Sequence, residues 1–265
     1  MSEQAVSPEQ PPPSATPTAA GGRPQTSPAG AEGSAPAVQR QFVNFAFFKL
    51  DPAFRRLGDH DKFQARSEFL NVFQQHPQPG MICLTYSTAG LRGDADFLLW
   101  RISLSTDSFQ QHQRLLNKTR LGAYLTSPHS FLSMTKRSMY VDKLDPFHTP
   151  ESRTHIIPGK RKYLFVYPFV KTRDWYLMPL AERQKIMDVH IAMGNKYPTV
   201  KLNTTYSFGL DDQEFVVAFE TEEPKDFLDL VQELRETQSS KYTLRDTPIF
   251  TCIQMPMENV LDQLF

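Results

Sequence analysis

An internal repeat most constrains what this 265-residue chain can fold into. The letters Thr-Tyr-Ser-Thr-Ala-Gly-Leu at 85–91 return as Thr-Tyr-Ser-Phe-Gly-Leu at 205–210. Acidic residues follow each copy, and then a strand-like segment that an aromatic residue opens, Phe97 in the first case and Phe215 in the second. The repeat therefore predicts two copies of one structural unit.

Hydrophobic periodicity predicts the same order of elements in both copies. In the first, we expect helices at 61–75 and 108–125 and strands at 42–50, 81–87, 96–104 and 130–141. In the second, we expect helices at 179–197 and 224–239 and strands at 162–170, 200–208, 214–221 and 248–254. Asp107 or Ser108 is the expected N-cap of the second helix, and Pro179 suits the first position of the third. Each copy thus has the β-α-β-β-α-β order of a ferredoxin-like fold, and we predict an α+β protein whose halves pack as a sandwich or barrel.

The composition divides the chain into a leader, a first half, a connection and a second half, at 1–40, 41–145, 146–161 and 162–265. The leader has no aromatic residue and holds 8 of the 21 prolines. Such a segment cannot bury enough apolar surface to offset its ordering entropy, so we predict that it is disordered. It also lacks the apolar core of a secretory signal.

Charge and cysteine content limit the classes of partner and compartment. Lys plus Arg equals Asp plus Glu at 29 each, so we expect no nucleic-acid partner. No apolar run approaches the roughly 18 residues that span a bilayer, so we expect no membrane insertion. The two cysteines, Cys83 and Cys252, each fall in a predicted strand, which fits a reducing compartment and a cytoplasmic location.

One histidine stands out on the third predicted helix. The apolar positions that recur there at helical spacing are Ile186, Val189, Met193 and Tyr197. His190 falls on the same face. A buried ring nitrogen needs a partner, because an unpaired buried polar group costs roughly 1–3 kcal/mol. Either another protein group or a metal centre meets that need.

A series of short motifs surrounds this helix and resembles a known family. In chain order they are Tyr-Pro-Phe-Val-Lys at 167–171, Asp-Trp-Tyr at 174–176, the helix with His190, Asn-Thr at 203–204, Ser-Phe at 207–208 and an acidic turn. Together they are similar to the chlorite dismutase superfamily, and within it to the coproheme decarboxylases. The resemblance covers about 41–251 and is strongest over 163–220.

The resemblance implies a fold, a substrate and two central residues. Two ferredoxin-like halves form a dimeric α+β barrel, and subunits assemble as a homopentamer. The second half binds an iron porphyrin: coproheme (iron coproporphyrin III) is the substrate, hydrogen peroxide the oxidant and haem b the product. His190 matches the proximal iron ligand. Tyr167 matches the radical-carrying tyrosine that takes a hydrogen atom from a propionate, although from the residues alone it also fits a tyrosine that packs its ring.

The same matching implies further substrate contacts. Lys171 falls beside the reacting propionate, or else is a solvated lysine at a strand end. Four positions could hold the other propionates, of which the first and last align best: Arg153, Lys160, Arg161 and Thr247. Trp175 falls at the rim of the pocket or has a purely structural role.

Two positions depart from the chlorite dismutases. Leu202 stands where those enzymes place a distal arginine, and because a leucine donates no hydrogen bond, we do not expect chlorite dismutase activity. It resembles the actinobacterial decarboxylases, which use a distal histidine; His148 and His155 are both candidates. Ser239 stands where a glutamate otherwise binds the proximal histidine, which implies a weaker hold on the iron and fits an enzyme that releases haem.

Three functions remain open from the sequence. The first is the peroxide-dependent decarboxylase, which needs both His190 and Tyr167. The second is a haem-binding protein with weak peroxidase or haem-transfer activity, which needs only His190. The third is a cofactor-free assembly protein, in which His190 is a core residue.

Overall fold

The computed structural model describes residues 39–75, 78–140 and 155–265. The predicted leader lies almost wholly outside these ranges, as does most of the predicted connection. Within them, no helix combines the length and the apolar character needed to cross a bilayer.

The first half has the predicted order of elements: β1 Phe42–Leu50, α1 Asp59–Gln75, β2 Ile82–Ser87, β3 Phe97–Ser103, α2 Thr106–Asn117 and β4 Leu125–Met134. The prediction that the second helix reaches residue 125 is wrong. The hydroxyl of Thr119 donates to the Leu116 carbonyl and accepts from the Gly122 amide, which folds the chain back after the helix. Only glycine fits at this return, because a Cβ on Gly122 would lie 2.1 Å from the Leu116 carbonyl oxygen. The N-cap of α2 is Ser105, whose side chain accepts from the Asp107 amide. The predicted N-caps, Asp107 and Ser108, are therefore wrong.

The second half repeats the order, with additions: β5 Tyr163–Lys171, α3 Arg173–Leu177, α4 Leu180–Gly194, β6 Lys201–Tyr206, β7 Phe215–Thr221, α5 Pro224–Arg235, β8 Thr243–Arg245, β9 Phe250–Gln254 and α6 Met257–Asp262. The sequence reading missed α3, β8 and α6, each too short to show a full period of its pattern. It also placed Pro179 inside the helix, where the structure makes it the N-cap of α4.

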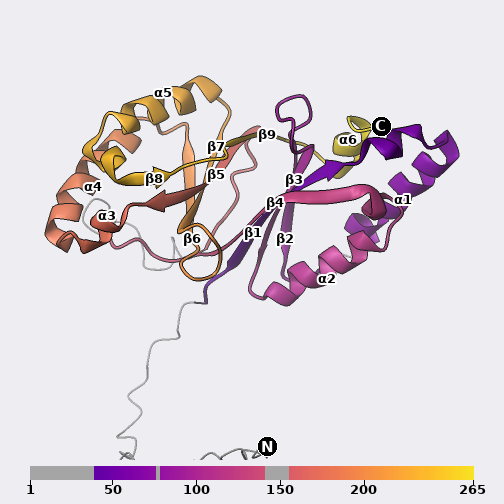
Figure 1. Ribbon diagram of the computed structural model, residues 1–265, viewed down its shortest axis with the longest axis horizontal. Helices are drawn as coiled ribbons and strands as arrows, with labels where there is room; N and C mark the ends of the chain where they lie inside the picture. Colours follow the sequence, from indigo (N-terminus) through magenta and orange to yellow (C-terminus); the bar gives the residue numbers. More distant parts are fainter. Residues whose placement is uncertain (1–38, 76–77, 141–154) are drawn as a thin grey trace, which may run out of the picture. The chain divides into compact units, whose positions relative to one another are not determined.

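Antiparallel pairing joins the strands of both halves into one sheet, which confirms the predicted mixed α+β fold (Figure 1). Within each half the hairpins run β2–β3 and β6–β7. Between the halves, β2 pairs with β9 and β4 pairs with β6. Since β5 also pairs with β7, the order of neighbouring strands returns to its start.

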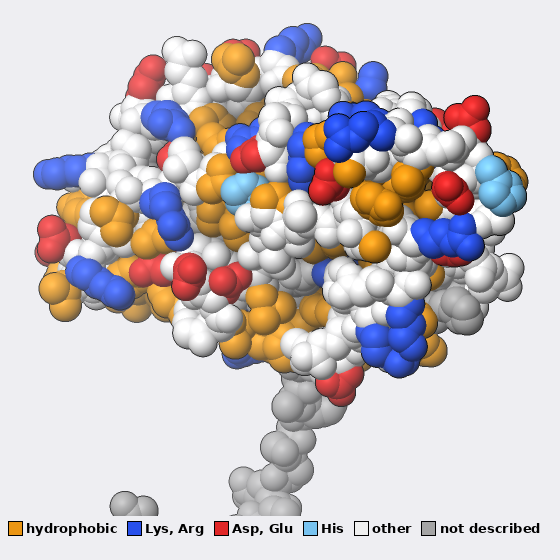
Figure 2. All heavy atoms as spheres, turned by 45° about the vertical axis from the view of Figure 1, so that its right-hand side comes forward, with side chains coloured by type: hydrophobic (Ala, Val, Ile, Leu, Met, Phe, Trp, Pro, Cys, Tyr) orange, Lys and Arg blue, Asp and Glu red, His pale blue; other side chains and the backbone are white. Residues whose placement is uncertain are grey.

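Helices cover one face of the sheet in each half: α1, α2 and α6 in the first, α4 and α5 in the second (Figure 1). The opposite faces contribute to a shared core between the halves, in which Phe47 stacks on Phe250 with ring centroids 3.9 Å apart. One expected position on a buried helical face is wrong, because Val189 of α4 is 56% exposed. On the face in Figure 2, basic and acidic side chains are interspersed with apolar ones.

Candidate functional site

His190 is held by one ring nitrogen and leaves the other available. Its Nδ1 lies 2.9 Å from the Oγ of Ser239, in the helical turn Gln238–Tyr242 that follows α5. The Ser239 hydroxyl in turn lies 3.0 Å from that of Thr237. In the part of the chain that the structure describes, Nε2 of His190 makes no hydrogen bond. Anchoring one nitrogen in this way fixes the ring orientation, as is usual for histidines that bind metals.

The surroundings of His190 keep its imidazole neutral. Burial lowers the pKa of His190 to about 4, and the nearby charge of Lys171 acts in the same direction. At neutral pH the ring therefore carries one proton. If Nδ1 carries it and donates to Ser239, the lone pair of Nε2 is free to bind a metal.

Lys171 lies at the end of β5 and reaches toward the same turn. Its Nζ donates to the Ser239 carbonyl at 3.0 Å and sits 4.4 Å from the centroid of the Trp175 ring. The residue is 9% exposed, and burial lowers the pKa of Lys171 to about 8, against the opposing charge of Glu214. The ammonium is thus still mainly charged at neutral pH. The alternative of a solvated lysine is wrong, because this side chain is buried.

Tyr167 lies on the same face of β5 as Lys171, since the two are four residues apart on a strand. Its ring stacks on that of Phe219, with centroids 6.1 Å apart. Its hydroxyl has no hydrogen-bond partner within the described residues. Burial raises the pKa of Tyr167, and the charge of Asp246 raises it further, so the phenol stays protonated at physiological pH. A neutral phenol with an unbound O–H is a possible hydrogen-atom donor.

The remaining candidates fall in different environments. Leu202 of β6 stands opposite Phe219 in the β6–β7 ladder, on the face that Tyr167 shares, and is 52% exposed. Trp175 of α3 is 3% exposed between Lys171 and Tyr242, which places it inside the fold rather than on its surface.

The candidates for propionate binding are less closely grouped. Thr247 is exposed and follows Asp246. Lys160 is exposed, whereas Arg161 donates to the Thr199 carbonyl at 2.5 Å. His155 is exposed on the surface. Arg153 and His148 lie outside the described residues.

Two groups near the site were missed by the sequence reading. Glu214 accepts from the Lys171 amide at 2.8 Å and from the Tyr176 hydroxyl at 2.5 Å, so it fixes the end of β5. Arg235, at the end of α5, forms an ion pair with Asp246 at 2.7 Å, and both charges act on Tyr167. The contacts of Glu214 join segments far apart in the chain, and no local pattern signals them.

The donor set around His190 fits one kind of metal centre. The described residues contain no group of three or more His, Cys, Asp or Glu side chains that could hold an ion. His190 could hold the iron of a porphyrin through Nε2, because such a group brings its own ring nitrogens as further ligands.

Comparison with known proteins gives the same family from sequence and from structure. The chlorite dismutase family model matches residues 62–255. Coproheme decarboxylase of Mycolicibacterium smegmatis is 29% identical over 226 residues, which cover 84% of this chain and 94% of that protein. Coproheme decarboxylase of Staphylococcus carnosus is 30% identical over 207 residues, which cover 71% of this chain and 81% of that protein.

Solved structures agree in fold. Two structures of chlorite dismutase from Candidatus Nitrospira defluvii, a mutant and a complex with imidazole, align with TM-scores of 0.75 and 0.74. Each is 26% identical to this chain and covers 84% of it, with 94% of its own length matched. The resemblance first seen in the motifs around His190 is confirmed over most of the length, and the chain belongs to the chlorite dismutase family.

Proposed function

We propose that this protein converts iron coproporphyrin III to haem b by oxidative decarboxylation, with hydrogen peroxide as the oxidant. The observation that carries the proposal is the anchored, neutral His190, in the same half as the buried Tyr167, whose raised pKa keeps its phenol protonated. Two relatives that cover most of this chain are coproheme decarboxylases. The alternative of a cofactor-free assembly protein gives no reason for that arrangement.

The proposed reaction balances for each propionate. One propionate, one hydrogen peroxide and one proton give a vinyl group, carbon dioxide and two water molecules. The side chain loses two electrons as its carboxylate leaves, and the peroxide O–O bond takes them up and breaks. The bound iron porphyrin supplies this redox chemistry, and the protein must hold the ring and place a group that moves the hydrogen atom.

His190 and Tyr167 divide these tasks in our proposal. His190 binds the iron through Nε2, with Ser239 fixing the ring from the other side. Tyr167 relays the hydrogen atom from the propionate, and its raised pKa keeps the O–H proton in place until that step. Leu202, on the same sheet face, lines the pocket with an apolar group.

Lys171 is proposed to bind the reacting propionate. One N–H of its ammonium donates to the Ser239 carbonyl, and its other N–H groups remain as donors for a carboxylate. The Trp175 ring makes a cation–π contact with that ammonium and so helps to position it. Arg153 and Thr247 stay proposed contacts for the other propionates. The homopentamer and the cytoplasmic location also stay predictions.

Mass spectrometry of the porphyrin tests the proposal. Purified full-length protein is mixed with iron coproporphyrin III, titrated with hydrogen peroxide and the products are analysed. We expect stepwise loss of two carboxyl groups and appearance of haem b. A His190→Ala control should fold normally yet show a changed ferric spectrum and little product.

The haem-binding alternative makes the opposite forecast. If the porphyrin binds, as judged by its Soret band, but keeps all four propionates after peroxide, that alternative replaces our proposal. Failure to bind at all would favour the assembly protein.

A further inference from the structure

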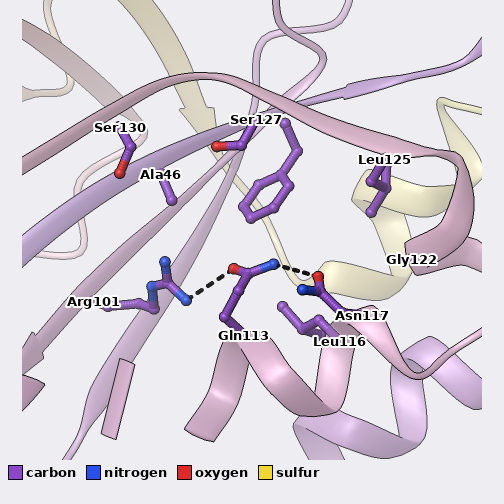
Figure 3. Close-up of a pocket in the computed structure, with 10 residues that line it drawn as sticks. Ala46, Arg101, Gln113, Leu116, Asn117, Gly122, Leu125, Ser127 and Ser130 are labelled. Carbon is purple, nitrogen blue, oxygen red and sulfur yellow. Dashed lines mark hydrogen bonds between the residues drawn. The ribbon is translucent and has the colours of Figure 1, made fainter. Parts of the chain in front are cut away.

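A pocket lies in the first half of the chain, between α2 and the strands of the sheet (Figure 3). Its volume is about 360 Å³. The residues that line it come from β1, β3, α2 and the chain around β4. All of them precede the second half, so this pocket is separate from the site around His190.

Arg101 is the only charged residue among those lining residues, and it is buried at 5% exposure. Its Nε and Nη2 both donate to Oδ1 of Asn44, at 3.1 and 2.7 Å, and its Nη1 donates to Oε1 of Gln113 at 3.3 Å. Both acceptors are neutral amides. Within the described residues, no carboxylate forms an ion pair with Arg101. A buried cation without a counter-ion is costly, because its lost hydration is only partly replaced.

The nearest group that could carry a negative charge does not do so. Cys83 stands opposite Arg101 in the β2–β3 ladder. Burial raises the pKa of Cys83 to about 12, so its thiol stays neutral at physiological pH. The described residues of the first half therefore supply no counter-ion for Arg101.

The unused donors of Arg101 indicate what kind of counter-ion fits. The three hydrogen bonds leave one N–H on Nη1 and one on Nη2. Charged N–H donors of this kind are suited to the oxygens of a carboxylate. In Figure 3, Arg101, Gln113 and Asn117 lie along one side of the pocket, with Ser127 and Ser130 on the strand across from them. Both serines are exposed, which gives the pocket an opening on β4.

We propose that this pocket binds a small organic carboxylate, which pairs with Arg101 and rests its apolar body on the pocket wall. A single positive charge favours a monoanion over a phosphate dianion. The wall is apolar at Ala46, Phe48, Leu116 and Leu125, which gives a short hydrocarbon body a surface to pack on. This inference concerns the first half alone and does not depend on the reaction proposed for the second.

Calorimetry with matched probes tests the proposal on the full-length protein. Butyrate carries both required features, butanol lacks the charge, and inorganic phosphate lacks the apolar body. We expect butyrate to bind with a dissociation constant on the order of 1 mM, and butanol and phosphate at least tenfold more weakly.

A charge placed inside the pocket gives the decisive variant. In Gln113→Glu the new carboxylate lies beside Nη1 of Arg101 and takes the place of the ligand, so butyrate affinity should fall at least tenfold while the melting temperature rises. Gln110→Glu adds the same charge to the exposed side of α2 and should change neither. This pair avoids removing Arg101, which risks unfolding the half.

Three results would overturn the proposal. Butyrate that binds no better than butanol would show that the charge of Arg101 is not used. Phosphate that binds more tightly than butyrate would contradict the ligand class. Equal butyrate binding by Gln113→Glu and the unmodified protein would place the ligand elsewhere.

Discussion

The two halves share one order of elements but fill the layer between helices and sheet differently. In the first half, sixteen buried apolar side chains form this layer, and the end of the chain adds four of them, Met257, Val260 and Leu261 from α6 and Leu264 after it. In the second half, the corresponding cluster contains five: Phe165, Tyr167, Phe219, Phe227 and Leu230. Around that smaller cluster the structure places a buried lysine, a neutral histidine and apolar side chains that stay exposed.

The difference teaches how a duplicated fold divides its tasks. Filling one layer with hydrocarbon stabilises the protein, because each buried Leu, Val or Phe side chain contributes roughly 1.5–3 kcal/mol. The layer of the second half contains fewer buried apolar side chains, and under the proposed function the bound porphyrin would pack there, beside Leu202. The first half should therefore carry stability, and the second half chemistry.

Tyr167→Phe gives the largest expected effect and tests whether the second half of the chain carries the chemistry. The change removes only an oxygen that has no hydrogen-bond partner within the described residues, so stability and porphyrin affinity should change by about 1 kcal/mol or less. If Tyr167 relays the hydrogen atom, decarboxylation should fall by orders of magnitude. Stopped-flow spectra with peroxide, read alongside porphyrin mass, measure both quantities. Turnover near that of the parent would remove Tyr167 from the mechanism.

Leu261→Ala gives the next largest effect and tests whether the packed layer of the first half carries the stability. Leu261 is fully buried in the layer of the first half, and truncating such a side chain typically costs about 2–5 kcal/mol. Denaturant unfolding should show this loss, while coproheme affinity should stay unchanged. Leu228→Ala is the matched control, because Leu228 of α5 is 62% exposed. A porphyrin-affinity loss in Leu261→Ala would show that the halves do not divide their tasks.

Sequence reasoning recovered most of the fold because the long elements carry their own pattern. The alternation of β1 and the repeated turn letters are local signals, and both located elements correctly. It failed where the boundary depends on a tertiary contact. The end of α2 is followed by the close approach of Gly122 to Leu116, and α6 packs on the first half and binds α1 through Arg66 and Gln74.

The residues of the candidate site also divide into those that the sequence predicted and those that it did not. The motifs led to His190, Tyr167 and Lys171, and the structure assigns each a defined environment. Their partner Glu214 escaped prediction, since it looks like an ordinary surface charge in the sequence and gains its position through long-range contacts with Lys171 and Tyr176. Trp175 illustrates the limit, because its letter fits a pocket rim as well as the buried position that it takes.

Ser239→Ala has a smaller expected effect and tests how the second half supports the proposed iron ligand His190. It removes the hydroxyl beside Nδ1 of His190 but keeps the backbone carbonyl that Lys171 uses. Loss of such a supporting hydrogen bond typically lowers metal affinity by about 10–100-fold. We therefore expect weaker coproheme binding and a shifted iron–histidine stretch in resonance Raman spectra, with an unchanged melting temperature. Ser239→Glu should move the stretch in the opposite direction. Unchanged spectra in both variants would show that Ser239 does not act on the iron ligand.

Leu202→Arg is the smallest expected effect and asks whether the exposed face of the second half really opens onto the iron. Leu202 shares that face with Tyr167 and is half exposed, so an arginine fits there without displacing core side chains. The parent should release little oxygen from chlorite, because a leucine donates no hydrogen bond to a departing oxyanion. An arginine at this position should raise the oxygen yield measured with an electrode, whereas Leu228→Arg on the outer surface of α5 should not. If both variants stay inactive while coproheme still binds, the ring lies too far from β6 for this residue to act, and the proposed pocket must be redrawn toward α4. Rapid oxygen release by the unmodified protein would instead show that a distal arginine is not needed here.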